Sequence, residues 1–112
     1  MKRIDPITEE AIRRFLELIR ERYDVAGAIL YGSRARGTYD PDSDADVAVL
    51  LKGEHLRFMP VKSAMDNTAF DVLLETDILV SPLPIWLEEW EHPEDSWNPE
   101  LFHNIDREGI RL

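Results

Sequence analysis

Residues 32–51 read GSRARGTYDPDSDADVAVLL, and this stretch decides both the fold and the chemistry expected of the chain. Small apolar residues precede it over residues 25–31, so its first glycine and serine form a turn at the end of a predicted strand. Glycine permits close approach to the backbone, and free N–H groups in such a turn can bind phosphate oxygens. The stretch therefore predicts a strand, a phosphate-binding turn, a loop and a second strand.

Two acidic residues, Asp44 and Asp46, open the second predicted strand over residues 45–51. Side chains alternate along a strand, so both carboxylates lie on one face at one end. Close carboxylates repel each other unless a cation lies between them, and Mg²⁺ takes carboxylate and phosphate oxygens together. Solvated loop acids are the alternative interpretation, but the order and spacing of the stretch favour a nucleotide–metal site.

The turn itself offers several phosphate ligands. The backbone at Gly32 and Ser33 and the hydroxyl of Ser33 are the first candidates. Arg36, and with it Arg34, supplies a planar fork of donors that can neutralise phosphate charge. Tyr39, in the following loop, either stacks on a nucleotide base or packs against its own loop.

GSRARG followed by SDAD and an apolar strand resembles the signature of the DNA polymerase beta-like nucleotidyltransferase superfamily, and the short chain is similar to its minimal members. The resemblance implies that Gly32 and Ser33 hold the triphosphate of an NTP, with ATP expected. It also implies that Asp44 and Asp46 bind Mg²⁺ and carry catalysis. The full set of predicted nucleotide-binding residues is Gly32, Ser33, Arg36 and Ser43.

Members of this superfamily transfer a nucleoside monophosphate from an NTP to a hydroxyl group. Minimal members often occur beside HEPN-domain proteins as toxin–antitoxin pairs, in some cases adding AMP to a tyrosine of the toxin. The resemblance therefore implies transfer of AMP to a HEPN-domain partner, with the chain as antitoxin. A homo- or hetero-oligomer is compatible with this role.

One expected feature of the family is missing. Fully active members carry a third carboxylate on the next core strand, where this chain reads ILVSPLPI and has Ser81. A serine hydroxyl is a poor general base, because it holds its proton too tightly at neutral pH. Asp71, Glu75 or Asp77 could substitute, although solvent-facing acids are the favoured interpretation of the first two.

A substitute acid is not required under two further hypotheses. A partner or the acceptor itself could supply the base. Alternatively, the domain binds nucleotide with little or no catalysis and neutralises its partner by contact, which is the second functional hypothesis.

The rest of the sequence predicts one α+β domain over residues 1–112, a small mixed or antiparallel sheet flanked by helices. Helices are predicted over residues 8–23, 60–76 and 98–109. Thr8 is the expected N-cap of the first, and Pro60 the first residue of the second.

A third strand is predicted over residues 78–85. Pro82 and Pro84 lack N–H donors on one side of it. This strand is therefore expected to lie at the sheet edge, or to pair only through its first half.

The composition excludes several classes of function. The net charge of −10 opposes nucleic-acid binding over most of the surface. The absence of cysteine excludes disulfides and thiolate metal sites. No apolar run approaches membrane-spanning length, and a cytoplasmic location is expected.

Aromatic and histidine residues gather in the second half of the chain. The histidines have no metal-ligand spacing and are expected at the surface: His55, His92 and His103. The tryptophans are Trp86, Trp90 and Trp97. The first two, four residues apart, are predicted to share one side of a short helix. Packing of the tail is their default role, and a partner surface is the alternative.

Overall fold

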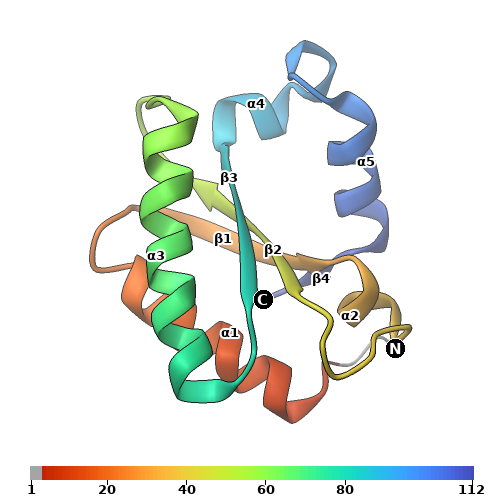
Figure 1. Cartoon of the computed structure of the whole chain (residues 1–112). Coiled ribbons are helices and arrows are strands. Elements are labelled where there is room, and N and C mark those ends of the chain that lie inside the picture. Colours follow the sequence, from red (N-terminus) through yellow and green to blue (C-terminus); the bar gives the residue numbers. More distant parts are fainter. Residues whose placement is uncertain (1–3) are drawn as a thin grey trace.

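The computed structural model describes residues 4–112, which form a four-stranded sheet with helices on both faces (Figure 1). In chain order the elements are α1 (Pro6–Ile19), β1 (Val25–Tyr31), α2 (Ser33–Arg36), β2 (Ala45–Leu51), α3 (Phe58–Thr76), β3 (Val80–Trp86), α4 (Leu87–Glu91), η1 (Pro93–Asp95), α5 (Pro99–Glu108) and β4 (Ile110–Arg111). None of these helices is long and apolar enough to cross a membrane.

The sheet is mixed, as predicted. The strand order is β3-β2-β1-β4, with β1 antiparallel to both β2 and β4 and with β2 parallel to β3. The strands at residues 25–31 and 45–51 occupy the predicted positions. The predicted element order lacked β4, because a strand of two residues is too short for any periodic pattern.

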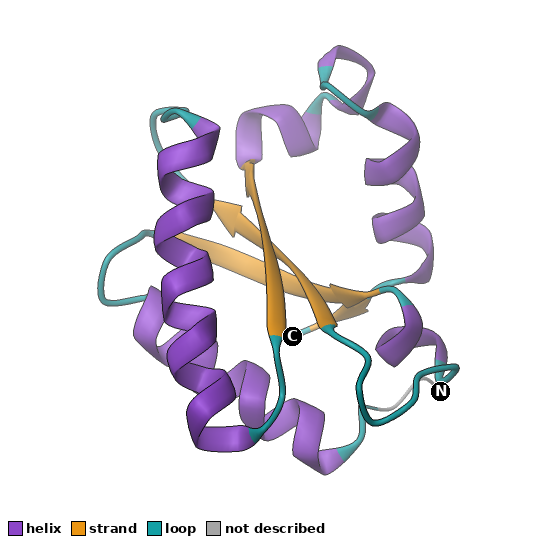
Figure 2. Cartoon of the chain, in the orientation of Figure 1, coloured by secondary structure: helices purple, strands orange, loops and turns teal. Residues whose placement is uncertain are grey.

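Helices cover both faces of the sheet (Figure 2). α1 and α3 pack against one face, where Val47 and Val49 of β2 point, and α5 packs against the other, where Ala48 and Leu50 point. β2 is thus buried on both sides. This burial explains why its sequence is an almost unbroken apolar run rather than an alternating one.

The proline-containing strand β3 lies at an edge of the sheet, which confirms the first of the two alternatives for it. The second alternative is wrong, because β3 pairs with β2 along its whole length, from Val80 opposite Ala45 to Trp86 opposite Leu51. The strand also begins two residues later than predicted. The two-residue spacing of the prolines directs both missing donors away from β2, so the ladder survives.

The first helix begins earlier than predicted, and its cap is a different residue. Asp5 caps α1, and its carboxylate accepts hydrogen bonds of 3.1 Å from the N–H groups of Ile7 and Thr8. Asp followed by Pro is a strong helix start, which the assignment of Thr8 as N-cap overlooked. Thr8 is instead fully buried within the helix. The helix ends at Ile19 rather than at residue 23.

The other helices follow the predicted pattern more closely. α3 begins at Phe58, so Pro60 lies inside its first turn and is not its first residue. α5 begins after Asn98, whose side-chain oxygen accepts a hydrogen bond of 3.1 Å from Leu101 N–H. It ends at Glu108, and Gly109 is its C-cap, as expected of the predicted stop.

The three tryptophans have different environments. Trp86 is the last residue of β3 and is 1% exposed, so the prediction that it shares a helix side with Trp90 is wrong. Trp90 lies on α4 and packs against Phe102, with ring centroids 5.8 Å apart. Trp97 is 57% exposed. Packing therefore accounts for the first two, and only Trp97 has the exposure that a partner surface needs.

Candidate active site

The residues predicted to carry chemistry lie together at one end of the strands. The end of β1 lies beside the starts of β2 and β3, because β2 runs antiparallel to β1 and parallel to β3. Asp46 is opposite Tyr31 on one side and opposite Ser81 on the other. Directly opposed residues on neighbouring strands project from the same face. Asp46 is therefore the centre of a row of three polar side chains.

Gly32 joins the predicted phosphate-binding turn to this row. Its φ is +76°, a conformation that strongly favours glycine, and a Cβ at this position would collide with the carboxylate of Asp46. The carbonyl of Gly32 accepts hydrogen bonds of 3.1 Å from the N–H groups of Ala35 and Arg36. These are the first bonds of the one-turn helix α2. The N–H of Ser33 precedes them and has no acceptor inside that helix.

The two carboxylates interact electrostatically. Burial raises the pKa of Asp46, and the negative charge of Asp44 raises it further, while Arg36 opposes both effects. Asp44 is exposed and Asp46 is partly buried. The structure therefore brings Asp44, Asp46 and Arg36 together, with two acids close enough to repel each other. A bound cation would relieve that repulsion.

The donor set fits Mg²⁺, provided that a nucleotide completes it. Mg²⁺ is commonly held by one or two carboxylates together with substrate phosphates and water. Within residues 4–112 no group of three or more His, Asp or Glu side chains is arranged to hold a metal. Asp44 and Asp46 would thus be the protein ligands, and phosphate oxygens at the Gly32 turn would be the others.

Arg36 has the freedom that a phosphate ligand needs. Its guanidinium is half exposed, and Nη1 lies 3.9 Å from Oε2 of Glu108 at the end of α5. An exposed ion pair of this length contributes little to stability. Arg36 can therefore exchange this contact for a phosphate.

Arg34 has no such freedom, and the prediction that it helps to neutralise phosphate is wrong. Its side chain is 3% exposed. Its guanidinium donates to Oγ1 of Thr8 at 2.8 Å and to the carbonyl of Ser43 at 2.9 Å. It also lies 3.7 Å from Asp5 and over the ring of Tyr39, 4.6 Å from the centroid. Arg34 is a structural residue that ties the loop to α1, and Tyr39 packs against it.

Ser43 also belongs to the architecture of this loop. Its hydroxyl accepts a hydrogen bond of 3.1 Å from the N–H of Asp40, and its carbonyl is held by Arg34. The predicted contact between Ser43 and the nucleotide stays a prediction.

Ser81, the residue at the position expected for the third carboxylate, lies opposite Asp46 in the β2–β3 ladder. The acids of α3 do not replace it. α3 packs on the face of the sheet opposite to Asp46, Asp71 is exposed, and Glu75 binds Arg14 of α1 at 3.0 Å. Their interpretation as solvent-facing acids holds. Asp77 is exposed at the C-cap of α3.

Sequence reasoning missed Tyr31. Burial raises the pKa of Tyr31 to about 12, and the charge of Asp46 adds to the shift, so its hydroxyl stays protonated at neutral pH. Antiparallel pairing of the two predicted strands around the loop would have placed Tyr31 near Asp46. The residue therefore joins the candidate site as a hydrogen-bond donor.

Residues 12–103 match the nucleotidyltransferase domain family. The chain belongs to this family. A relative from Methanocaldococcus jannaschii, named as a proposed protein adenylyltransferase, is 34% identical over 77 residues, which cover 69% of this chain and 74% of the relative. The crystal structure of a proposed nucleotidyltransferase from Sulfolobus solfataricus superposes with a TM-score of 0.50 at 21% identity, covering 82% of this chain and 84% of that one.

These matches confirm the resemblance to polymerase beta-like nucleotidyltransferases. The Sulfolobus likeness bears on the fold alone and agrees with the mixed sheet flanked by helices. The nucleotidyltransferase is thus an enzyme of known class, and NTP is its expected substrate.

Proposed function

We propose that this nucleotidyltransferase transfers AMP from ATP to a hydroxyl group on a protein partner, with Mg²⁺ as cofactor. The observation that carries the proposal is the close approach of the Gly32 backbone to Asp46, with Asp44 and Arg36 beside them. The turn proposed to bind phosphate therefore lies directly beside two carboxylates that repel each other. The name of the Methanocaldococcus jannaschii relative supports AMP as the transferred group and protein as the acceptor.

The reaction is a substitution at the α-phosphorus. The acceptor oxygen forms a bond to this phosphorus while the bond to the bridging oxygen breaks, and pyrophosphate departs. The backbone of Gly32 and Ser33 orients the phosphates, and Arg36 balances their charge. Mg²⁺ held by Asp44 and Asp46 would neutralise phosphate oxygens.

The proton of the acceptor hydroxyl has no carboxylate base at the usual position, because Ser81 stands there. We propose that the acceptor protein or water takes this proton, so transfer without the correct partner is slow. The partner proposed from the family is a HEPN-domain protein, for which the nucleotidyltransferase acts as a cytoplasmic antitoxin.

Calorimetric titration of ATP, with and without Mg²⁺, tests the nucleotide–metal site. Binding should need Mg²⁺ and should be lost in Asp44→Asn. The partner is then added with ATP, and its mass is expected to increase by one AMP group per modified hydroxyl. No binding of any NTP would refute the proposed site.

A second function is favoured by one observation, the serine opposite Asp46. A nucleotidyltransferase domain with two carboxylates could bind ATP without turnover and neutralise its partner by contact. The double variant Asp44→Asn/Asp46→Asn separates the two functions. Under the first it leaves the partner active and unmodified, and under the second it still binds and inhibits the partner.

A further inference from the structure

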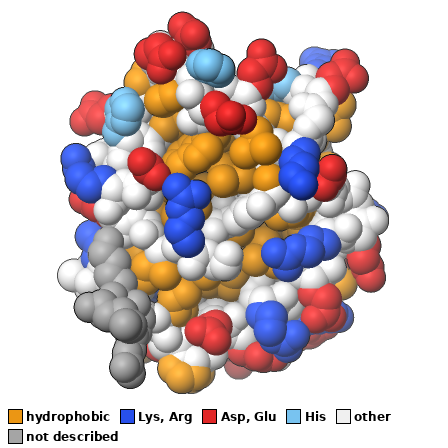
Figure 3. All heavy atoms as spheres, turned by 180° about the vertical axis from the view of Figure 1, so that it is seen from behind, with side chains coloured by type: hydrophobic (Ala, Val, Ile, Leu, Met, Phe, Trp, Pro, Cys, Tyr) orange, Lys and Arg blue, Asp and Glu red, His pale blue; other side chains and the backbone are white. Residues whose placement is uncertain are grey.

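The negative charge of the chain is concentrated in one segment. Residues 63–106 contain 11 Asp and Glu residues and no Lys or Arg, although the whole chain has a net charge of −10. Within this segment, α4 and η1 follow the far end of β3, opposite the candidate active site (Figure 1). Acidic and histidine side chains gather at this end in Figure 3, and most Lys and Arg side chains of that face lie below them. We call this end the acidic pole, made of Glu88, Glu89, Glu91, Glu94 and Asp95.

A hollow of about 320 Å³ adjoins the acidic pole and has mainly aromatic walls. It is lined by His55, Phe58, Glu89 and Trp97. Two aromatic rings and one carboxylate in an otherwise apolar lining are elements that can bind a cationic side chain. The rings of Phe58 and Trp97 can attract the cation through their π faces, and the carboxylate of Glu89 can pair with it.

The carboxylate of this hollow is held in place. Oε1 of Glu89 accepts a hydrogen bond of 3.0 Å from the N–H of Trp86, and Oε2 lies 3.5 Å from Nε2 of His55. His55 in turn stacks on Trp86, with ring centroids 4.1 Å apart and planes inclined by 22°. The position of Glu89 is therefore fixed before any ligand arrives, which reduces the entropic cost of binding.

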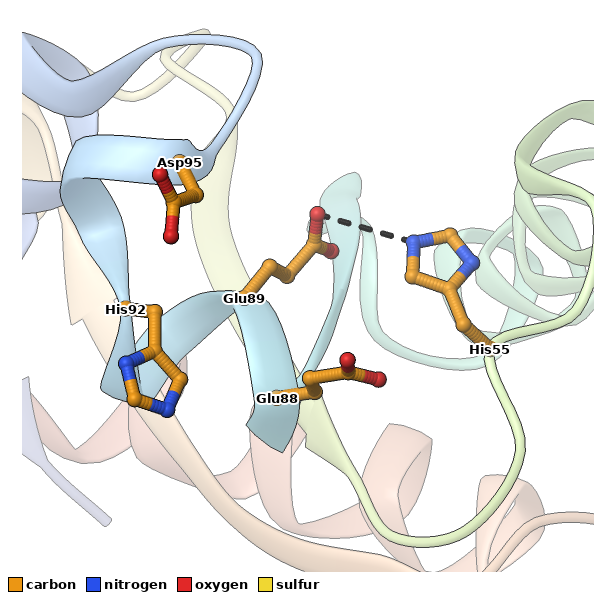
Figure 4. Close-up of a pocket in the computed structure, with 5 residues that line it drawn as sticks. All are labelled: His55, Glu88, Glu89, His92 and Asp95. Carbon is orange, nitrogen blue, oxygen red and sulfur yellow. Dashed lines mark ion pairs between the residues drawn. The ribbon is translucent and has the colours of Figure 1, made fainter.

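A second hollow of about 320 Å³ continues from the first, and the two share His55 and Glu89. It is lined by His55, Glu88, Glu89, His92 and Asp95 (Figure 4). Glu88, Glu89 and Asp95 supply three carboxylates, yet no three of the described acids and histidines are arranged to hold a metal ion. The arrangement suits a larger cation, an ammonium or guanidinium group, whose several donors reach separated oxygens.

We propose that the two hollows bind closely spaced Arg or Lys side chains on a basic segment of a protein partner. One cationic group would enter the aromatic hollow between Trp97 and Glu89, and a second would enter the acidic hollow beside it. Leu56 and Met59, which flank this region in sequence, are exposed and can contact the aliphatic stems. A basic segment is the occupant that complements this charge, whereas nucleic acid would be repelled.

The position of this surface lets the enzyme bind partner and nucleotide at once. The seven residues of β2 separate the two ends of the sheet, a distance of roughly 20 Å. Binding at the acidic pole leaves the Gly32 turn and Asp46 open. The proposal does not depend on catalysis, so ATP binding and peptide binding can be tested separately on the same protein.

The first test uses a synthetic heptapeptide with two adjacent arginines flanked by glycine and serine. Binding is followed by tryptophan fluorescence and calorimetry, because Trp97 is exposed at the site. The matched control peptide carries citrulline, a neutral analogue with nearly the same shape, in place of both arginines. We expect saturable binding that weakens with salt, and a loss of about tenfold or more with citrulline. Equal binding of the two peptides, or no binding of either, would overturn the proposal.

Variants then locate the site. Trp97→Ala and Glu89→Gln should each weaken peptide binding by about tenfold, and Gln retains an oxygen for the N–H of Trp86. Glu91→Gln is the control, since it removes one charge from an exposed position of the same helix that does not line either hollow. It should change binding by less than about twofold.

Equal losses of peptide binding in Glu89→Gln and Glu91→Gln would show general charge attraction and refute the two-hollow site. Retained Mg²⁺-dependent ATP binding in all three variants shows that the fold is intact.

Discussion

The carboxylates at the two ends of the sheet have different surroundings. At the acidic pole, Glu89 accepts a backbone hydrogen bond from Trp86 and lies 3.5 Å from His55, so its carboxylate is held in a fixed position. At the candidate active site, Asp46 is partly buried beside the like charge of Asp44, and its pKa is raised. A carboxylate that is held in position is a rigid docking group for a cation, whereas a pair of repelling carboxylates is poised for a cation that arrives with substrate.

The largest expected effect is at the candidate active site. Asp46→Asn should reduce AMP transfer by at least about a thousandfold, because it removes a carboxylate proposed to hold Mg²⁺ against the phosphates. Transfer is measured with ATP labelled at the α-phosphate. The matched control Glu89→Gln removes one carboxylate at the opposite end of β3 and should leave ATP binding unchanged. A similar loss of ATP binding in both variants would contradict the division between the two ends.

A second comparison lies within the four residues of α2. Arg34→Ala should destabilise the protein by about 3 kcal/mol, because it leaves Thr8 and the carbonyl of Ser43 without their buried donor. Arg36→Ala should change the free energy of unfolding by less than about 0.5 kcal/mol, because its pair with Glu108 is long and exposed. Only Arg36→Ala should weaken ATP binding in the folded protein. Urea unfolding measures the stability, and calorimetry measures ATP binding. If Arg34→Ala lost ATP affinity and Arg36→Ala kept it, Arg34 rather than Arg36 would be the phosphate ligand.

The turn at Gly32 provides a third contrast, with Gly37. Both glycines have a positive φ, but a Cβ on Gly32 would collide with Asp46, whereas a Cβ on Gly37 would meet nothing within 4 Å. Gly37→Ala should therefore cost about 1 kcal/mol, and Gly32→Ala about 1–2 kcal/mol more. Thermal unfolding measures the stability, and ATP titration should show loss of affinity in Gly32→Ala alone. Equal costs would mean that the backbone does not stand as close to Asp46 as described.

These contrasts also show how far the sequence could predict the structure. β1 and β2 were predicted at their observed bounds, since apolar runs bounded by glycine and aspartate leave little choice. The prolines of β3 likewise indicated an edge strand. Arg34 and Arg36, by contrast, precede the same loop two residues apart. Their roles differ because of Asp5 and Thr8, which are far away in sequence and reach Arg34 only in the folded chain.

The same limit applies to the active site. The pairing of Asp44 and Asp46 followed from strand alternation, and Ser81 was identified from its place on the next strand. Tyr31 became visible only through the register that sets it opposite Asp46. Local pattern therefore predicted the residues proposed to bind the phosphates and the metal, while the residues that surround them depend on tertiary packing.

Ser81→Asp tests the missing carboxylate directly. A third acid opposite Asp46 should increase Mg²⁺ affinity and speed AMP transfer by about tenfold, because it can ligate the metal or accept the acceptor proton. Ser81→Asn has nearly the same size without the charge and is the control. An unchanged rate in Ser81→Asp, with the fold retained, would show that the proton leaves by another route.

The smallest expected effect is on stability, and its sign is opposite to the effect on activity. The pKa of Asp46 is raised in the folded protein, chiefly by burial, so the native state holds this proton to higher pH than the unfolded chain does. The free energy of unfolding should therefore fall as pH rises from the ordinary aspartate pKa of 3.8 through the raised native pKa, and remain lowered above it. Asp46→Asn removes this loss, so its Tm should exceed that of the wild type at pH 7 by a few degrees.

The difference in Tm between Asp46→Asn and the wild type should shrink toward acidic pH, where Asp46 is protonated in both states. It should also shrink or reverse at pH 7 when ATP and Mg²⁺ are added, since only the wild type retains both carboxylates for the cation. Thermal unfolding over a pH series, with and without ATP and Mg²⁺, measures both trends. A Tm difference that does not change with pH would mean that the cost of Asp46 is steric. A Tm difference that changes with pH but not with ATP and Mg²⁺ would mean that Asp46 does not hold the cation.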